Sequence, residues 1–253
     1  MENDIIYGVH AVTEALLTNS VNKLYIQEDL RGKNVDKIKA LAQEHQVSVS
    51  WLPKTELAKL SENGVHQGFL ARVAAYEYTD FDNLLKQLKT RESATLLILD
   101  GLTDPHNLGS IARTADATAV DGIIIPKHRA VGITPVAAKA ATGALQYLPV
   151  SRVTNLSQSL DKLKAAGFWI FGTDMAGTDY RQWNVAGKIA LIIGAEGAGM
   201  SAGLKKQVDE LITIPMTGHV QSLNASVAAA LLMYEIVRRK TGCEERLFKG
   251  VQN

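Results

Sequence analysis

Five apolar runs indicate the architecture of this chain: LLILD (residues 96–100), GIIIP (122–126), FWIFGTD (168–174), IALIIG (189–194) and LITIP (211–215). Each run is apolar along most of its length and does not alternate with polar residues. Strands that are apolar on both faces belong to parallel sheets that helices cover on both sides. The sequence therefore predicts an α/β domain built on a parallel sheet.

Segments with helical patterning separate these runs, as a doubly wound sheet requires. They span residues 109–119, 135–145, 156–166 and 222–239. Together with the five apolar runs, they predict one domain over residues 94–253.

The first 75 residues have a different pattern, in which short helical and extended segments alternate. These segments are VHAVTEALL (9–17), KLYIQ (23–27), VDKIKALAQEH (35–45), VSVSW (47–51) and GFLARV (68–73). We therefore expect a small α/β domain over residues 1–75. Residues 76–93 begin polar and aromatic and end in an amphipathic run, so we expect a linker that leads into a short helix.

Composition bounds the class of protein. Hydrophobic residues make up 46% of the 253 residues and charged residues 21%, as in a folded globular protein, and the net charge of +1 does not by itself indicate nucleic acid. The single cysteine, Cys243, excludes an internal disulfide, and no Cys/His spacing fits zinc, so we expect no metal and a reducing, cytoplasmic setting. No apolar run approaches about 18 residues, so we expect no membrane segment.

Three of the apolar runs lead into small and polar residues, and ligands of such sheets bind at these strand ends. The first segment, DPHNLGSIAR (104–113), is a turn followed by a helix. Asn107 and Arg113 are six residues apart, close to two helical turns, so we expect both to face the strand-end cleft. The alternative is a capped helix in which Arg113 pairs with a carboxylate.

The second segment, GAEGAGMS (194–201), has glycines that let the backbone approach a ligand closely. Their order, GxxGxG, is the reverse of the dinucleotide fingerprint, and no acidic residue is placed as that fingerprint requires. This argues against a nicotinamide-dependent oxidoreductase. The alternative is a tight turn in which Glu196 lies near a helix N-terminus.

The third segment runs from residue 214 to 228 and passes from a polar loop into an alanine-rich helix. Ser222, Asn224 and Ser226 can satisfy the free amides of that helix. Helix capping accounts for only one of these three side chains. The alanines that follow give the helix a face of small residues, which predicts close packing against another helix or subunit.

Taken together and in this order, the segments resemble the three motifs of the SpoU/TrmH family of RNA ribose 2'-O-methyltransferases, which belong to the trefoil-knotted (SPOUT) methyltransferases. The motifs are NxGxxxR (107–113), GxEGxG (194–199) and IPMxGxxxSLNxSVAAA (214–230). YGVHAVTEALL (7–17) and HQGFLARV (66–73) are similar to the ribosomal-protein-like, RNA-binding domain of the bacterial branch that methylates a guanosine of 23S rRNA.

The resemblance implies methyl transfer from S-adenosyl-L-methionine (SAM), without a metal, to the ribose 2'-hydroxyl of a guanosine in 23S rRNA. It also implies a knotted catalytic domain, RNA as partner and a homodimer that completes the site. The residues implied to bind SAM are Thr173, Gly194, Gly197, Ile214, Met216, Leu223 and Asn224. Those implied to be catalytic are Asn107, Arg113, Glu196, Ser222 and Asn224.

Among these residues, Arg113 stays charged and can hold a phosphate through two hydrogen bonds. The resemblance implies that Arg113 binds the target nucleotide and helps to deprotonate its 2'-hydroxyl. Asn107 is then expected to orient Arg113 or the ribose, and Glu196 to fix its loop. Ser222 and Asn224 are expected to complete the target pocket. His219 and Gln221 depart from the small residues of many relatives, which affects substrate contacts.

Basic side chains outside the motifs are candidates for contacts with RNA. They are Lys23, Arg31, Lys33 and Lys37 in the first domain and Lys127, His128 and Arg129 after the GIIIP run. The alternative for each of these side chains is that it only faces solvent and contacts no RNA. Two other functions stay open: the same chemistry on tRNA or another rRNA nucleoside, and a non-catalytic RNA-binding or ribosome-assembly protein.

Overall fold

The computed structural model describes residues 3–61, 63–74, 76–195, 197, 199–220 and 222–240. Contacts divide the chain into two compact units. The first consists of residues 1–77 and 133–139, and the second of residues 78–132 and 140–253. The second unit therefore begins within the predicted linker.

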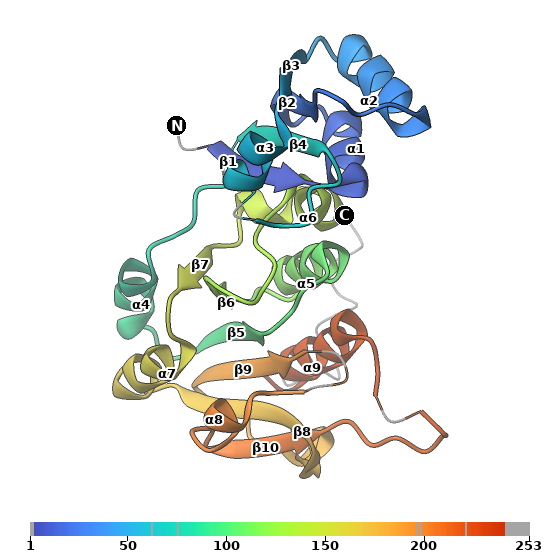
Figure 1. Cartoon of the computed structure of the whole chain (residues 1–253). Coiled ribbons are helices and arrows are strands. Elements are labelled where there is room, and N and C mark those ends of the chain that lie inside the picture. Colours follow the sequence, from blue (N-terminus) through green and yellow to red (C-terminus); the bar gives the residue numbers. More distant parts are fainter. Residues whose placement is uncertain are drawn as a thin grey trace, which may run out of the picture. The chain divides into compact units, whose positions relative to one another are not determined.

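The first unit contains a four-stranded sheet in the order β1-β4-β2-β3 (Figure 1). Its strands are β1 (Asn3–Tyr7), β2 (Val21–Gln27), β3 (Ser48–Leu52) and β4 (Phe69–Ala74). Strands β2 and β3 are parallel because helix α2 connects them, whereas β4 is antiparallel to both of its neighbours.

Alternation along these strands determines which helix covers which face of the sheet. Leu24 and Ile26 share a core with helices α1 (Val9–Leu17) and α2 (Lys33–Glu44). Tyr25, between them in the sequence, packs instead with Leu57 of helix α3 (Lys54–Leu60). The small α/β domain expected from the sequence is thus present.

The second unit contains a six-stranded sheet in the order β10-β8-β9-β5-β6-β7, and all of its strand pairs are parallel. Its strands are β5 (Ala94–Asp100), β6 (Gly122–Pro126), β7 (Val150–Val153), β8 (Trp169–Asp179), β9 (Lys188–Gly194) and β10 (Glu210–Thr213). The predicted parallel α/β sheet is confirmed. The threading of the chain into a knot stays a prediction.

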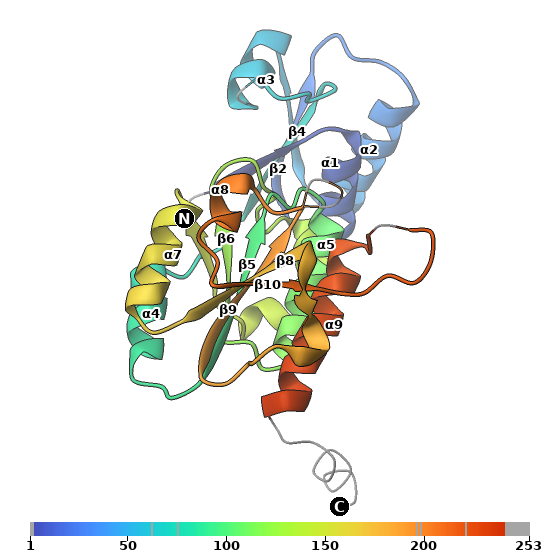
Figure 2. The same cartoon turned by 90° about the horizontal axis from the view of Figure 1, so that it is seen from below.

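Helices cover both faces of this sheet (Figure 2). On one face lie α4 (Phe81–Lys89), α7 (Leu156–Ala165) and α8 (Ala202–Lys205), which share a core with β5, β8 and β9. On the other face, α5 (Pro105–Ala117) packs against α9 (Ala225–Lys240). The remaining described helices are α6 (Pro135–Ala141), most of which belongs to the first unit, η1 (Ala144–Gln146) and η2 (Tyr180–Gln182).

Helix α4 lies inside the segment predicted as a linker. Asp80 caps its N-terminus by accepting a hydrogen bond from the Asn83 N–H, and Leu84 and Leu88 are buried in the core of the second unit. Of the described helices, none is long and apolar enough to cross a membrane.

Candidate functional site

The carboxyl ends of three neighbouring strands, β8, β9 and β5, form the edge at which the predicted motifs meet. Asp100 at the end of β5 lies opposite Gly194 at the end of β9, and Gly172 of β8 lies opposite Ile192 of β9. The motif segments follow β5, β9 and β10 directly. This edge is where parallel α/β sheets bind ligands.

Helix α5, which carries the first motif, begins at an earlier residue than the sequence pattern predicts. Asp104 accepts a hydrogen bond from the His106 N–H at 2.9 Å, and Pro105 occupies the first helical position. Asn107 therefore lies in the first turn of α5, with only 6% of its surface exposed.

Arg113 is exposed on α5, and no hydrogen bond or ion pair joins its side chain to another described residue. A helix turns by about 100° per residue, so six residues leave Asn107 and Arg113 about 120° apart around the axis. Asn107 is buried and Arg113 is exposed, and that both face the strand-end cleft stays a prediction.

The structure instead joins Asn107 to Asn224, which precedes α9. The Asn224 Nδ2 donates to the Asn107 Oδ1 at 3.0 Å. The Asn224 Oδ1 accepts from the Ser226 N–H at 2.9 Å and from the Ser226 Oγ at 2.6 Å, and so caps α9. The Asn107–Asn224 pair thus couples the starts of two helices that carry the first and third motifs.

The second motif folds back on itself after β9. Ala195 and Gly199 exchange two backbone hydrogen bonds, of 3.1 and 2.8 Å. A Cβ atom on Gly194 would lie 2.3 Å from the Gly199 carbonyl carbon, so this position accepts only glycine without a shift of backbone. The Ser201 N–H donates to the Asp100 Oδ2 at 2.8 Å and ties the loop to β5. Gly197 is exposed within the loop, and Glu196 falls outside the described residues.

Sequence reasoning missed an irregular segment in β8. Gly172 pairs with Leu211 of β10, but the next residue of β10, Ile212, pairs with Thr178, so residues 173–177 bulge out of the sheet. Within this bulge, the Thr173 Oγ1 donates to the Ile192 carbonyl oxygen at 3.1 Å and lies beside the end of β9. Glycines at residue 172, just before the bulge, and at residue 177, the last residue of the bulge, were the available signal.

An ion pair anchors the same bulge. Asp174 lies 2.7 Å from the Lys205 ammonium of α8, and its carboxylate also accepts the Ala176 N–H. The hydrogen bond from Lys205 and then that from Ala176 lower the pKa of Asp174. The bulge is therefore a fixed part of the strand-end edge.

The other predicted residues lie on the segment between β10 and α9. Ile214, Met216 and Leu223 are half-buried, whereas Ser222 is exposed. Apolar side chains that are only half covered can contact an organic ligand. Within the described ranges, no group of His, Cys, Asp and Glu could hold a metal ion.

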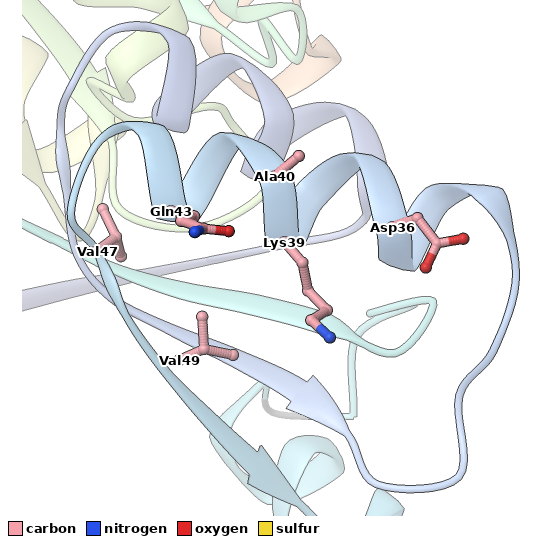
Figure 3. A pocket seen from close by; sticks show the side chains of 6 residues that line it. All are labelled: Asp36, Lys39, Ala40, Gln43, Val47 and Val49. Atoms are coloured by element: carbon pink, nitrogen blue, oxygen red, sulfur yellow. The ribbon is translucent and has the colours of Figure 1, made fainter.

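A separate hollow of about 500 Å³ lies in the first unit, along α2 and the neighbouring strand β3 (Figure 3). Its lining residues are Asp36, Lys39, Ala40, Gln43, Val47 and Val49. It contains none of the predicted catalytic or cofactor-binding residues.

Comparison with known proteins gives matches for both units. Residues 94–234 match the SpoU rRNA Methylase family, and residues 5–79 match the family described as RNA 2'-O ribose methyltransferase substrate binding. A chain from Staphylococcus aureus strain MSSA476, assigned by name to the TrmH family of tRNA/rRNA methyltransferases, is 51% identical over 243 residues. The alignment covers 95% of this chain and 98% of that relative.

Two solved structures with bound AdoMet, which is SAM, resemble the chain. The SpoU methyltransferase AviRb from Streptomyces viridochromogenes is 26% identical with a TM-score of 0.61, and the match covers 95% of this chain and 92% of AviRb. The rRNA methyltransferase from Sinorhizobium meliloti is 25% identical with a TM-score of 0.60, over 94% of this chain and 87% of that one. By these matches the chain belongs to the SpoU rRNA methylase family.

Proposed function

We propose that the protein transfers a methyl group from SAM to the ribose 2'-hydroxyl of a guanosine in 23S rRNA. One observation supports this most: the ends of β5, β9 and β10 bring the three family motifs to one edge of a parallel sheet. The match of residues 5–79 to a substrate-binding family supports RNA as the partner. RNA of bacterial cells lies in the cytoplasm, where we place the reaction.

The residues at this edge fit SAM. Half-buried Ile214, Met216 and Leu223 offer apolar surface to an adenine ring, and the glycine loop after Gly194 brings backbone amides close to a ligand. Thr173, Gly197 and Asn224 complete the proposed binding set. SAM, when bound, supplies a methyl group on a positively charged sulfur, which is already a strong electrophile.

The protein then has to hold the ribose and manage one proton, because a 2'-hydroxyl is a poor nucleophile until its proton is removed or its oxyanion is stabilised. We assign Arg113 to the target phosphate and to the developing oxyanion, because its exposed guanidinium can stabilise both. The 2'-oxygen forms its bond to the methyl carbon as the bond from that carbon to sulfur breaks, the neutral sulfide leaves, and the proton of the hydroxyl passes to solvent. Ser222 lies on the adjoining loop and is assigned to the target pocket. Glu196 is assigned to holding the glycine loop.

The geometry supports a positioning role for Asn107, because its side chain is buried and accepts a hydrogen bond from Asn224. Through this contact it fixes the start of α9 and the preceding loop, which carries Ser222 and Leu223. Asn224 then acts both as a helix cap and as part of the cofactor site.

We also propose a homodimer that uses α9. Val227, Leu231 and Tyr234 follow one another at intervals of four and three residues and are 48%, 41% and 56% exposed. Such spacing places them on one side of the helix, opposite the side that packs on the core. An apolar stripe that stays exposed on a packed helix is typical of a subunit interface.

The test is transfer of labelled methyl from SAM to purified large-subunit rRNA and, separately, to bulk tRNA. Ribose methylation blocks alkaline cleavage, so hydrolysis of the product maps the modified nucleotide. One protected guanosine in the rRNA is the expected result. Label in tRNA would support methyl transfer but show that tRNA, and not 23S rRNA, is the substrate. SAM binding without transfer to either RNA would favour a non-catalytic RNA-binding protein.

A further inference from the structure

Three consecutive residues with basic side chains, Lys127, His128 and Arg129, follow β6; we call them the basic strap. All three are exposed, and within the described part of the chain no hydrogen bond or ion pair engages their side chains. The adjoining residues 130–132 complete the loop that leaves the sheet. The strap thus presents positive charge that the fold itself does not neutralise.

The strap leaves the sheet next to the proposed methyl-transfer site. Ile98 of β5 lies opposite Ile124 of β6, and both strands end two residues later, at Asp100 and Pro126. Adjacent strands are about 4.8 Å apart, so the strap begins about one strand spacing from the end of β5. RNA with its ribose at the ends of β9 and β5 would therefore pass within reach of a Lys or Arg side chain of the strap.

Backbone contacts hold the strap in place. The Lys127 N–H donates to the Val153 carbonyl oxygen and the Val131 N–H to the Leu102 carbonyl oxygen, both at 2.8 Å. Arg152 donates from Nη2 to the Lys127 carbonyl oxygen at 3.0 Å, and its guanidinium lies 5.4 Å from the centre of the Tyr78 ring. Leu102 belongs to the loop that starts α5, so the strap is tied to the first motif.

Arg129 has an unusual backbone conformation for its residue type, with a φ of 60°. Left-handed conformations suit glycine and asparagine, and a long side chain there adds strain that tends to occur at functional positions. Glycine would adopt this conformation without strain, so an arginine at this position indicates that its side chain has a function.

We propose that the basic strap binds the phosphodiester backbone of the RNA substrate next to the ribose that receives the methyl group, with Arg152 positioning the strap. Phosphate fits these side chains because Lys127 and Arg129 are positively charged and only donate hydrogen bonds, and a phosphate is a charged acceptor. The inference rests on the proposed function, since it assigns part of the substrate contact for that reaction.

The first experiment compares two double variants that each remove two positive charges. Lys127→Ala/Arg129→Ala changes the strap, and Lys86→Ala/Lys89→Ala changes exposed residues of α4, which leads to the amino end of β5. Binding to purified large-subunit rRNA and to bulk tRNA is measured between about 50 and about 200 mM salt. The affinity falls as salt rises, and each lost phosphate contact makes the negative slope of log K against log salt shallower by about 0.7 to 0.9.

We therefore expect the slope of the strap variant to be shallower than that of the wild type by about 1.5, while the α4 variant keeps the slope of the wild type. The KM for RNA should rise in the strap variant, and its affinity for SAM should match the wild type. Equal slopes for all three proteins on both RNAs would overturn the inference. Because RNA binding is measured without methyl transfer, this result stands apart from the test of the proposed function.

The second experiment separates charge from backbone strain by a single change, Arg129→Gly. Glycine adopts the φ of 60° without strain, so we expect the Tm to rise or stay level while RNA affinity falls severalfold. Arg129→Lys, which keeps the charge, should retain most of the RNA affinity. A glycine variant that binds RNA as tightly as the wild type would show that Arg129 makes no RNA contact.

Discussion

Asn107 shows how one buried amide can connect two motifs. Asn107→Leu removes the acceptor of the Asn224 Nδ2 and should lower the free energy of unfolding by about 1–3 kcal/mol, because the donor is left without this partner. Asn107→Asp keeps an acceptor in the first turn of α5, where negative charge is favourable, so its loss should be smaller.

Urea unfolding and SAM titration of both variants measure these effects. SAM affinity should follow the same order, wild type, then Asp, then Leu, because the pair fixes the loop before α9. If the Leu variant bound SAM as well as the wild type, the positioning role of Asn107 would be wrong.

Gly194 is the residue at which the glycine loop has the least space. Gly194→Ala places a methyl group against the backbone of Gly199, so the loop must move, and we expect a loss of about 1–3 kcal/mol in stability and a large loss of SAM affinity. Gly203→Ala, in α8, is the matched control because a Cβ there meets no atom within 4 Å. Calorimetry with SAM should find the control equal to the wild type; normal SAM binding by the Gly194→Ala variant would remove this loop from the cofactor site.

Helix α9 carries a carboxylate, Glu235, whose contribution to stability should depend on pH because it pairs with Arg238 and Arg239. The hydrogen bond from Arg238, followed by that from Arg239, lowers the pKa of Glu235 below its usual value of 4.5, against the opposing effect of burial. A carboxyl whose pKa is lowered by folding stabilises the fold above its unfolded pKa. That contribution is lost as the pH falls through the lower, folded pKa.

Glu235→Gln should therefore reduce stability at neutral pH by less than about 1 kcal/mol, as is typical of ion pairs within one helix. The difference from the wild type should shrink below pH 4.5 and vanish once Glu235 is protonated in the folded protein. Urea unfolding between acidic and neutral pH measures it, with Asp161→Asn on the exposed side of α7 as control. A difference that stays constant with pH would contradict this account.

Elements with strong patterns were predictable from the sequence, and their junctions were not. The apolar runs gave the strands of the parallel sheet because burial on both faces leaves no alternation. Helix α5 begins at Pro105, earlier than the pattern predicts, since Asp104 and Pro105 act as cap and first turn rather than as a loop. The β8 bulge and the Asn107–Asn224 contact depend on pairing between distant segments, which periodicity within one segment does not record.

At the scale of the whole molecule, a net charge of +1 means that RNA affinity must come from local groups of cations. Several basic side chains of the second unit are already paired within the fold, among them Lys162, Lys164, Lys205 and Arg238. The basic strap differs from these because its charges are exposed and have no partner in the described chain. The salt dependence of RNA binding should therefore come from few residues, and removing two of them should make it measurably shallower.

The proposed dimer belongs to this scale too, and the stripe on α9 provides its test. Leu231→Asp places a charge in the middle of the stripe, between Val227 and Tyr234, so we expect the dimer to dissociate. Val65→Asp is the matched control, because Val65 is 81% exposed and lies in the first unit. Sedimentation over a range of protein concentrations measures the state of each protein.

The wild type and the Val65 variant should sediment as dimers, and the Leu231 variant as a monomer whose Tm no longer rises with protein concentration. If the partner completes the methyl-transfer site, the monomer should also lose methyl transfer, because each site then lacks the groups that the second subunit contributes. A wild type that stays monomeric at every concentration would show that the α9 stripe serves another contact. A monomeric Leu231 variant with full activity would show that one chain holds the complete site.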